Sequence, residues 1–452
     1  MNIDLSAIFK AYDVRGLYPD ELDEDVARRV GAAFARFVTS GDSESGSRRV
    51  VTGRDMRTSS PALARAFAEG VTAAGSSVVD VGEVSTDALY FASGKLDLPG
   101  VMFTASHNPA RYNGLKMCKA QAVPIGSDSG MEDIKKGAAE PVEATEPSIE
   151  EVDILADYAA HCRSFVDAGA LRPLKVAIDA GNGMAGKTVP IVFEELPFDV
   201  TPLFFELDGT FPNHPANPIE ADNIRALQEA VTAHGCDVGI AFDGDADRMF
   251  LVDENARQIS GSLTTALVAE TMLKKNPGEK IIYNLICSWT VPEVVTENGG
   301  EPIRTRVGHS FIKKVMADTG AIFGGEHSGH YYFRDNFRAD SGMIAALLVL
   351  EAMSVAGAPL SATLEPFRRY EASGEINTEV SDQDGTIEKL AETYAKGRQD
   401  RTDGLTVEFE QWWFNCRASN TEPLLRLNLE AKTKELMETK RDEVLGVIKE
   451  EA

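Results

Sequence analysis

Ser106 is the residue of this chain best placed to act as a nucleophile or to carry a group that is handed over. It follows the apolar run Val101–Phe103, which we expect to end a buried strand. Pro109 then interrupts regular structure, so Ser106 should lie on a tight turn just past the strand. Ligand sites of open α/β sheets gather at that edge, and a serine there can do covalent chemistry. The alternative is an ordinary turn serine that bonds the local backbone.

Asp243, Asp245 and Asp247 alternate directly after the apolar run 238–242. Carboxylates this close together repel one another unless a cation offsets their charge. Mg²⁺ binds through few carboxylates and leaves positions for phosphate oxygens, so the loop predicts a metal site. Two alternatives remain open. The three acids could be solvated at a strand end, or they could belong to a calcium loop, which requires glycine where Arg248 stands.

Two further polar loops could bind parts of a phosphorylated ligand. Arg417, Ser419, Asn420 and Thr421 lie between two strand-like segments near the C-terminus. Their guanidinium, hydroxyl and amide groups, with the turn N–H groups, suit phosphate, although such strings also form ordinary turns. Residues 324–330 follow another apolar run and offer polar groups for hydroxyls.

Alternating strand and helix patterns must position these loops. The clearest helices are expected at 22–38 and after Ser60-Pro61, with Ser60 as N-cap. Apolar runs predict strands, and a return strand is expected at Met249–Val252. Alternating strands and helices give mostly parallel sheets. The expected strands before the C-terminal region are 50–52, 78–82, 101–103, 176–179, 238–242, 280–285 and 321–323.

The C-terminal region has a different pattern. Residues 405–409 and 425–429 alternate as half-exposed strands, and a charged helix follows from about Lys432. We therefore predict an α/β fold of three similar domains with mixed or parallel sheets, followed by a small α+β domain. The expected domains are 1–150 with the serine loop, 151–253 with the acidic loop, 254–368 with the hydroxyl-binding loop, and 369–452 with the phosphate loop.

Composition excludes several classes of protein. Acidic residues outnumber basic ones 71 to 45, for a formal charge of −26, so nonspecific binding to nucleic acid or anionic membranes is not expected. The same charge predicts a salt-adapted, haloarchaeal-like host. The five cysteines lack Cys-x-x-Cys spacing and indicate neither a disulfide framework nor a zinc site. With neither a signal-peptide pattern nor an apolar run of membrane-spanning length, we expect a cytoplasmic protein.

Taken together, the loops suggest a metal, a phosphate-carrying serine, a phosphate clamp and a site for hydroxyls. In this combination the sequence resembles the α-D-phosphohexomutases, the family of phosphomannomutases and phosphoglucomutases. The resemblance spans nearly the whole chain, and its motifs occur in family order. They are Tyr12–Gly16, Thr104–Pro109 (phosphoserine loop), Tyr112–Lys116, Asp243–Arg248 (magnesium loop), Gly325–His330 (sugar loop) and Arg417–Thr421 (phosphate loop).

The resemblance implies an isomerase, an intramolecular phosphotransferase with its domains around a central cleft. Phosphorylated Ser106 would donate its phosphoryl group to a hexose phosphate, and the resulting hexose 1,6-bisphosphate would return its other phosphate to Ser106. The resemblance also implies Mg²⁺ on Asp243, Asp245, Asp247 and a phosphate oxygen of Ser106. Sugar phosphates are the expected partners, and both a monomer and a homodimer remain open.

The same resemblance suggests roles for other residues. Lys116, Arg248 and His107 would lie near the transferring group, although His107 could equally be structural. Glu326 and Ser328 would bind the sugar 3- and 4-hydroxyls. The remaining expected substrate ligands are Arg15 near the phosphoserine, His309 and His330 in the cleft, and Arg417, Ser419, Asn420 and Thr421 at the phosphate that is not transferred.

One position departs from the family pattern. The family often has lysine in a Val-Lys-x-Ser string, whereas this chain has Ile286 in Leu285–Ser288. This puts in doubt one cationic substrate contact and an acid–base role, for which Lys313 and Lys314 are candidate replacements.

Glucose and mannose differ only at the 2-hydroxyl, so a loop that binds the 3- and 4-hydroxyls should accept both sugars. Three alternatives remain. A phosphoglucosamine mutase more often has Gln where His327 stands, a phosphatase would use Asp243 as its nucleophile, and a sugar-phosphate sensor would bind without turnover.

Overall fold

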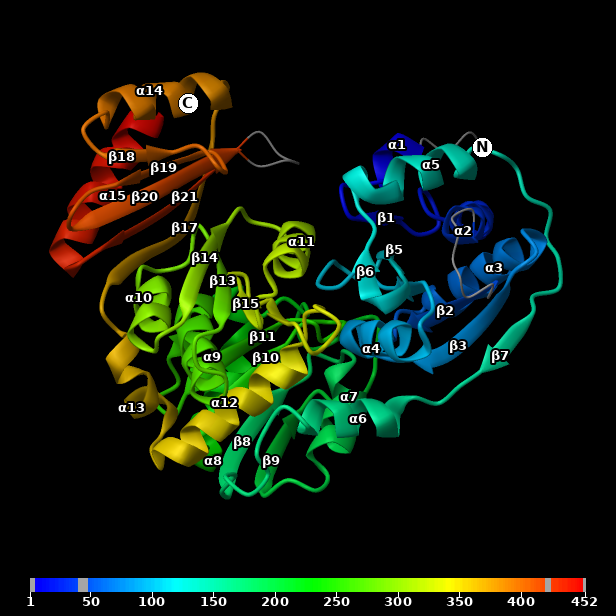
Figure 1. Ribbon diagram of the computed structural model, residues 1–452, viewed down its shortest axis with the longest axis horizontal. Coiled ribbons are helices and arrows are strands. Elements are labelled where there is room, and N and C mark those ends of the chain that lie inside the picture. The colour runs from blue at the N-terminus through cyan, green and yellow to red at the C-terminus, as the bar shows by residue number, and fades with distance from the viewer. Residues whose placement is uncertain (1–4, 40–47, 419–423, 450–452) are drawn as a thin grey trace. The chain divides into compact units, whose positions relative to one another are not determined.

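The computed structural model describes residues 5–39, 48–418 and 424–449. Its contacts divide the chain into two compact units, which Figure 1 shows in ribbon form. The first unit comprises Met1–Ile259 and Ser328–Thr363, and the second comprises Ser260–His327 and Leu364–Ala452.

The first unit opens with a mixed sheet in the order β1-β5-β4-β2-β3-β7, with β6 beside β5. The central strands run parallel, and β5 runs antiparallel to both β1 and β4. The strands are β1 (Asp13–Leu17), β2 (Arg49–Arg54), β3 (Ser77–Glu83), β4 (Gly100–Phe103), β5 (Tyr112–Lys119), β6 (Val123–Pro124) and β7 (Ile149–Glu151). The helices are α1 (Leu5–Ile8), α2 (Glu24–Thr39), α3 (Ser60–Ala73), α4 (Thr86–Leu96) and α5 (Glu132–Ala138).

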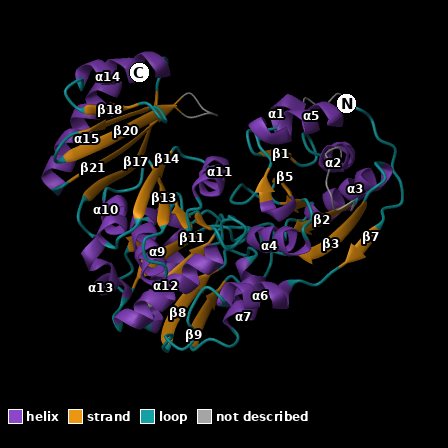
Figure 2. Cartoon of the chain, in the orientation of Figure 1, coloured by secondary structure: helices purple, strands orange, loops and turns teal. Residues whose placement is uncertain are grey.

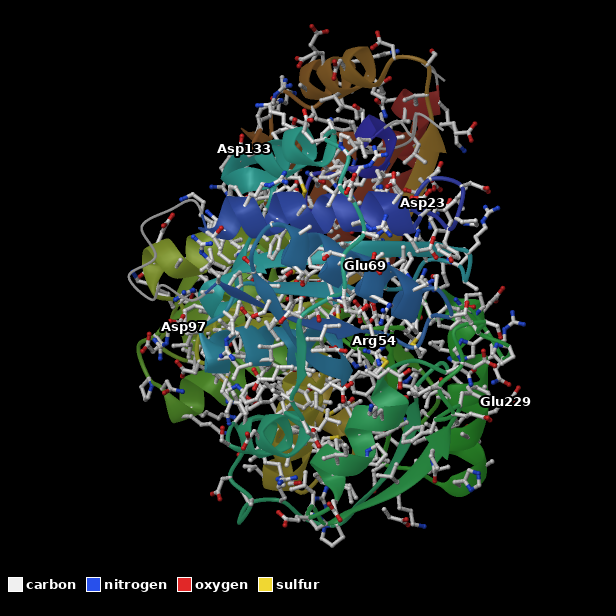
Figure 3. The ribbon with its side chains drawn as sticks, turned by 90° about the vertical axis from the view of Figure 1, so that its right-hand side faces the viewer. Asp23, Arg54, Glu69, Asp97, Asp133 and Glu229 are labelled. Carbon is white, nitrogen blue, oxygen red and sulfur yellow. The ribbon has the colours of Figure 1, made fainter. Side chains whose placement is uncertain are left out.

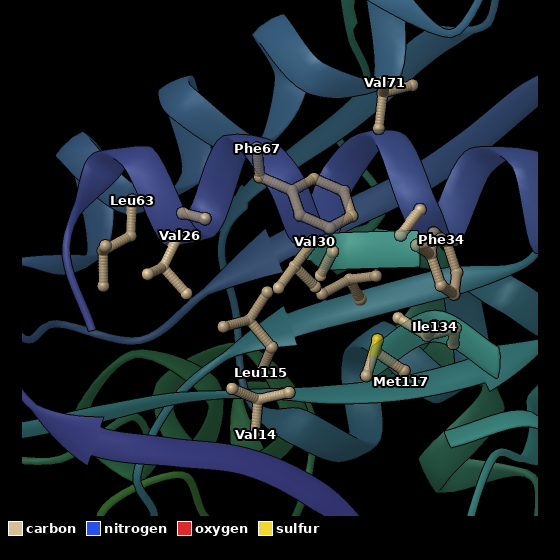
Figure 4. Packing of buried hydrophobic residues seen from close by; sticks show 14 of the residues in the cluster. Val14, Val26, Val30, Phe34, Leu63, Phe67, Val71, Leu115, Met117 and Ile134 are labelled. Atoms are coloured by element: carbon tan, nitrogen blue, oxygen red, sulfur yellow. The ribbon is translucent and has the colours of Figure 1, made fainter. Parts of the chain in front are cut away.

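Helices α2 and α3 pack closely and build the core of this domain. Buried side chains such as Val30, Phe34 and Phe67 from the two helices meet those of the sheet (Figure 4). The helices approach so closely because glycine stands at the crossing. A Cβ at Gly31 would lie 2.2 Å from the Phe67 carbonyl oxygen, and one at Gly70 would lie 1.9 Å from that of Arg28.

The expected N-cap at Ser60 is wrong. The cap position of α3 is Ser59, whose side chain makes no capping bond, and Ser60 is the first helical residue. The Ser60 hydroxyl instead donates to Asp55 Oδ1 at 2.7 Å. The buried carboxylate therefore takes the hydroxyl that local sequence preference would assign to the helix end.

A second sheet in the first unit has the order β12-β11-β10-β8-β9. Strands β9, β8 and β10 run parallel, and β11 returns antiparallel to β10, as the sequence predicted. The strands are β8 (Leu174–Asp179), β9 (Phe198–Leu203), β10 (Val238–Phe242), β11 (Met249–Asp253) and β12 (Gln258–Ile259). The other elements that begin in this unit are α6 (Leu155–Arg163), α7 (Ala185–Phe193), α8 (Arg225–His234), β16 (Tyr331–Phe333), α12 (Gly342–Ala356) and α13 (Leu360–Leu364).

The second unit contains a parallel group of strands in which β13 lies between β14 and β15. An antiparallel sheet follows, in the order β17-β21-β20-β19-β18, and α14 and α15 pack on it (Figure 2). The first group comprises α9 (Gly261–Lys275), β13 (Lys280–Asn284), α10 (Thr290–Glu297), β14 (Glu301–Thr305), α11 (His309–Thr319) and β15 (Phe323–Gly325). The second comprises β17 (Glu371–Glu379), α14 (Gln383–Thr393), β18 (Arg398–Asp400), β19 (Leu405–Glu408), β20 (Trp412–Ala418), β21 (Leu424–Ala431) and α15 (Lys434–Lys449).

Within these described ranges, no single helix is long and apolar enough to cross a membrane. The bent pair formed by α12 and Leu360–Phe367 reaches the required length and apolarity only when its two parts are added together, and most of α12 is buried.

Candidate active site

Ser106 lies in the first unit, directly beyond the end of β4, as the sequence predicted. All four residues of β4 are buried, so the turn after it is held at the edge of the sheet. Ser106 has φ of +50°, and its backbone N–H donates to the Thr104 hydroxyl at 2.9 Å. Few side chains adopt this left-handed conformation, so the fold must hold the serine in place.

Arg57 holds the carbonyl groups of the Ser106 turn. Its guanidinium donates to the carbonyl oxygens of Ser106 (2.9 Å), Asn108 (2.7 Å), Pro109 (2.9 Å) and Tyr112 (2.9 Å). The guanidinium side chain is fully buried. The rigid fork of arginine donors suits several acceptors in one plane.

The sequence interpretation missed Arg57, although a signal was present. Arg57 also pairs with Asp55 at 3.2 Å and lies 5.1 Å from the ring centre of Phe211. Arg57 belongs to the polar residues that follow the apolar strand β2, just as the Ser106 turn follows β4. Strands β2 and β4 are parallel neighbours. Their loops therefore share one edge of the sheet.

The Ser106 hydroxyl faces the acidic loop. It donates to Asp243 Oδ2 at 2.7 Å, and His107 Nδ1 lies 3.2 Å from the same hydroxyl. Arg248 Nη2 is 3.5 Å from it and 2.8 Å from Asp243 Oδ2. Burial, with the charges of Arg248 and Arg15, lowers the pKa of His107 to about 2, so its imidazole is neutral at ordinary pH.

The acidic loop follows β10 and brings its three carboxylates together. Each offers an oxygen within 4.8 Å of the others, and all three residues are buried. Lys116 on β5 bridges Asp245 Oδ2 at 2.7 Å and Asp247 Oδ2 at 2.5 Å. Burial alone would raise the pKa of Asp245, but the Lys116 ammonium and the Thr86 hydroxyl hold it below its usual value.

These carboxylates fit a hard cation. The Oδ1 atoms of Asp245 and Asp247 are buried and have no hydrogen-bond partner among the described residues. Burial and the negative charge of Asp245 raise the pKa of Asp247 to about 7. Buried carboxylate oxygens without a hydrogen-bond partner destabilise the fold unless a bound ligand contacts them, and Mg²⁺ prefers oxygen ligands.

Arg15 and His330 complete the predicted residues around this site. Arg15 on β1 donates to the side-chain oxygen of Asn108 at 2.7 Å, so it contacts the Ser106 turn. His330 forms a β-bridge with Arg248, and its Nδ1 lies 3.0 Å from Asp340 Oδ2 and 4.0 Å from Asp247 Oδ1. Burial alone would lower the pKa of His330, but these carboxylates raise it.

The sugar loop is divided between the two units. Ser328 begins the second segment of the first unit and is partly buried. Glu326 belongs to the second unit, where it is 2% exposed at the end of β15. Its Oε1 accepts from the Asn284 side chain and from the Gly308 N–H, each at 3.2 Å. Two strand ends and the start of α11 thus fix Glu326.

Arg417 lies at the end of β20 in the second unit. Its Nη2 donates to Glu375 Oε2 at 2.7 Å, while Nη1 is buried without a hydrogen-bond partner among the described residues. Burial lowers the pKa of His327 on the sugar loop; the negative charge of Glu375 opposes that effect, and the positive charge of Arg417 adds to it. Of the predicted phosphate clamp, Arg417 therefore lies close enough to His327 to affect its charge.

Some predicted site residues fall outside the description. Ser419, Asn420 and Thr421 lie outside the described residues, and the side chain of His309 is not described. Ile286, where the family often has lysine, is buried beyond the end of β13.

The second unit also holds a cavity of about 350 Å³, lined by Tyr283, Cys287, Trp289, Arg304, Glu408 and Trp413 among others. None of the predicted site residues that the structure describes lines it.

An α/β fold that sets a serine hydroxyl against a buried carboxylate triad and two basic side chains defines a class of phosphoryl-transfer enzyme. Sequence profiles of one family cover the chain in four parts. Phosphoglucomutase/phosphomannomutase α/β/α domains I, II and III match residues 6–144, 156–258 and 260–370, and the C-terminal domain matches 375–447.

Individual relatives agree with these profiles. A phosphohexose mutase of Xanthomonas campestris is 42% identical over 450 residues, with 98% of this chain and 99% of that protein covered. A phosphomannomutase of Escherichia coli is 40% identical over 457 residues, with the same coverage. A phosphoglucomutase/phosphomannomutase family protein of Burkholderia thailandensis has a similar structure, with a TM-score of 0.89, 34% identity, and coverage of 99% of this chain and 98% of that one.

The chain belongs to the phosphoglucomutase/phosphomannomutase family, and the predicted fold class is confirmed. It is a phosphohexose mutase, and therefore an isomerase.

Proposed function

We propose that the chain interconverts the 1- and 6-phosphates of mannose and glucose through phosphorylated Ser106 and a hexose 1,6-bisphosphate. The observation that carries this proposal is the 2.7 Å hydrogen bond from the Ser106 hydroxyl to Asp243, beside two carboxylate oxygens that have no hydrogen-bond partner among the described residues. A phosphoryl group on Ser106 would enter a site already equipped with Lys116 and Arg248.

The proposed reaction has two balanced transfers. In the first, the free hydroxyl of a hexose phosphate attacks the phosphorus of phospho-Ser106. The bond from phosphorus to the serine oxygen breaks, a bond to the sugar oxygen forms, and the proton of the sugar hydroxyl ends on Ser106. After the bisphosphate turns end for end, Ser106 takes the other phosphoryl group, and the proton returns to the oxygen that leaves. No phosphate is gained or lost overall.

Asp243, Asp245, Asp247 and a phosphate oxygen on Ser106 would hold Mg²⁺. When bound, Mg²⁺ would neutralise negative charge that builds up on the transferring group. Lys116 and Arg248 would add positive charge at the same place, because both already contact the triad. Neutral His107, 3.2 Å from the serine hydroxyl, would orient that hydroxyl.

Substrate recognition would come from several loops. We assign the sugar 3- and 4-hydroxyls to Glu326 and Ser328, and the phosphate that is not transferred to Arg417 and the 419–421 loop. Arg417 suits this role because its Nη1 is buried without a partner among the described atoms. Arg15, His309 and His330 would complete the substrate contacts. In this reading the domains are 1–150, 151–253, 254–368 and 369–452.

The geometry favours Ser106 over Asp243 as the nucleophile. Arg248 donates its backbone N–H to Asp243 Oδ1 and its guanidinium to Oδ2, which also accepts from Ser106. Both carboxylate oxygens of Asp243 thus accept hydrogen bonds, which suits a metal ligand or a group that orients the serine. A phosphatase that uses Asp243 would need one of them free to attack phosphorus.

The test is the chemical nature of the phosphoenzyme. Protein incubated with ³²P-labelled glucose 1,6-bisphosphate should carry label that survives hydroxylamine and is absent from Ser106→Ala. Label that hydroxylamine removes, or that persists in Ser106→Ala, would assign the covalent step to a carboxylate instead. Binding of sugar phosphates without turnover or label, with Mg²⁺ and the bisphosphate present, would instead indicate a sensor.

A further inference from the structure

We propose that Thr86 is a positioning residue for the cation ligand Asp245. The inference rests on the proposed function, because it concerns the same carboxylate triad. Thr86 is the first residue of α4 and is fully buried. Its hydroxyl donates to Asp245 Oδ2 at 2.6 Å, and its backbone N–H donates to the Asp245 carbonyl oxygen at 3.0 Å.

These two bonds fix both the side chain and the backbone of Asp245. Lys116 binds the same Oδ2 atom at 2.7 Å, so that oxygen has two donors. The other oxygen, Oδ1, is buried and has none among the described residues. A carboxylate held at one oxygen cannot rotate freely, so its second oxygen keeps a constant direction.

Thr86 and Lys116 differ in what they do to a cation. The Lys116 ammonium carries a positive charge and repels a cation bound to the same carboxylate. The Thr86 hydroxyl orients the carboxylate without adding charge. Of the two donors to Oδ2, Thr86 is therefore the one that orients the carboxylate without repelling the cation.

The start of α4 is itself held firmly. The buried carboxylate of Asp87 accepts from Tyr158 on α6 and from Ser341 at the N-cap of α12, each at 2.6 Å, and also from Ser85. The first residue of α12, Gly342, packs closely on the acidic loop, since a Cβ there would lie 3.1 Å from the Ala246 carbonyl oxygen. The starts of α4 and α12 thus both contact the acidic loop.

The experiment measures Mn²⁺ binding to the full-length, dephosphorylated protein, with free Mn²⁺ followed by electron paramagnetic resonance. Thr86→Ala removes the hydroxyl, and Thr86→Ser keeps it. Loss of a group that orients a metal ligand weakens metal binding by about 10–100-fold, and we expect this increase in Kd for Thr86→Ala. Thr86→Ser should bind like wild type, and excess Mg²⁺ should restore the turnover of Thr86→Ala.

Thr86→Val, which keeps the volume but not the donor, is a second variant if Thr86→Ala is poorly folded by circular dichroism. An unchanged Kd in either folded variant overturns the role of Thr86, as does Thr86→Ser binding as weakly as Thr86→Ala. Asp245→Asn distinguishes loss of the cation site itself from loss of the contribution of Thr86. If wild type binds Mn²⁺ no more tightly than Asp245→Asn, the cation site fails, and the role of Thr86 fails with it. If only Asp245→Asn loses binding, the site stands and Thr86 has no part in it.

Discussion

Arg57 donates a hydrogen bond to the carbonyl oxygen of Ser106 at 2.9 Å, and the same guanidinium binds three more carbonyl groups of that loop. The serine that we propose to carry phosphate is thus held through its backbone by a residue 49 positions earlier in the chain. Its hydroxyl remains available to the acidic loop.

Arg57→Lys should lower both stability and kcat. Lysine keeps the charge but has three donors, so carbonyl groups now bound to Arg57 would be left buried without partners. Each such group costs about 1–3 kcal/mol. Denaturant unfolding and initial rates measure the two effects. Arg54→Lys is the matched control, because Arg54 on the same segment forms a partly exposed pair with Asp80, which should be worth at most about 1 kcal/mol. If Arg57→Lys and Arg54→Lys lowered stability and kcat equally, the hydrogen bonds from Arg57 to the Ser106 loop would have no special role.

Arg417→Ala should raise KM more than it lowers kcat, because the proposed phosphate contact is present throughout the reaction. One lost charged hydrogen bond is worth about 1.5–3 kcal/mol, or roughly tenfold or more in KM. Arg426→Ala is the control, since Arg426 contacts the same Glu375 at 3.4 Å from a more exposed position. A KM for Arg417→Ala within error of wild type would remove Arg417 from the phosphate site.

Glucose and mannose phosphates should be used with kcat/KM values within about tenfold of one another, a barrier difference near 1.4 kcal/mol. Discrimination requires a buried polar group that the wrong sugar leaves unpaired, and Glu326 is assigned to hydroxyls that both sugars share. Glu326→Gln should therefore depress both activities alike. A coupled assay measures this, and glucosamine 6-phosphate is the decisive competitor. Higher kcat/KM for glucosamine 6-phosphate than for both neutral sugars would assign a phosphoglucosamine mutase.

Asp87 should make stability fall as pH rises through about 6. Burial raises its pKa from 3.8 to about 6, although three hydroxyl donors oppose this, so the folded state favours the protonated carboxyl. Between the two pKa values the folded state binds more protons than the unfolded state, and stability falls with pH. Tyr158 and Cys162, whose own pKa values the charge of Asp87 affects, both titrate well above this range. Urea unfolding from pH 4 to 8 should show this slope in wild type and a weaker one in Asp87→Asn.

The thermal midpoint should rise from about 0.1 M to about 2 M KCl, where screening acts over only a few ångströms. The formal charge is −26, and acids such as Asp97, Asp133 and Glu229 are exposed (Figure 3). Sucrose is the control, because it stabilises through exclusion from the surface and not through screening. A flat curve in KCl would contradict salt adaptation.

The apolar runs and the polar loops after them were readable from the sequence alone. Ser106 after β4, Asp243 after β10 and Glu326 after β15 obey one local rule, because a buried strand must end where polar residues begin. The return strand β11 was recognisable for the same reason, and β19 and β21 were recognisable from alternating apolar residues, whereas β20, which carries Arg417, was not predicted. Such features depend on a few neighbouring residues.

Only the tertiary structure decided which polar atoms meet. Thr86 and Asp245 are 159 residues apart, and nothing in either local segment indicates that one orients the other. Ser60 shows that even a nearby residue can overturn a local prediction. Helix propensity assigns the Ser60 hydroxyl to the helix cap, but the buried carboxylate of Asp55, five residues away, accepts it instead. A buried donor pairs with whichever acceptor the packing brings to it, and that packing depends on the whole chain.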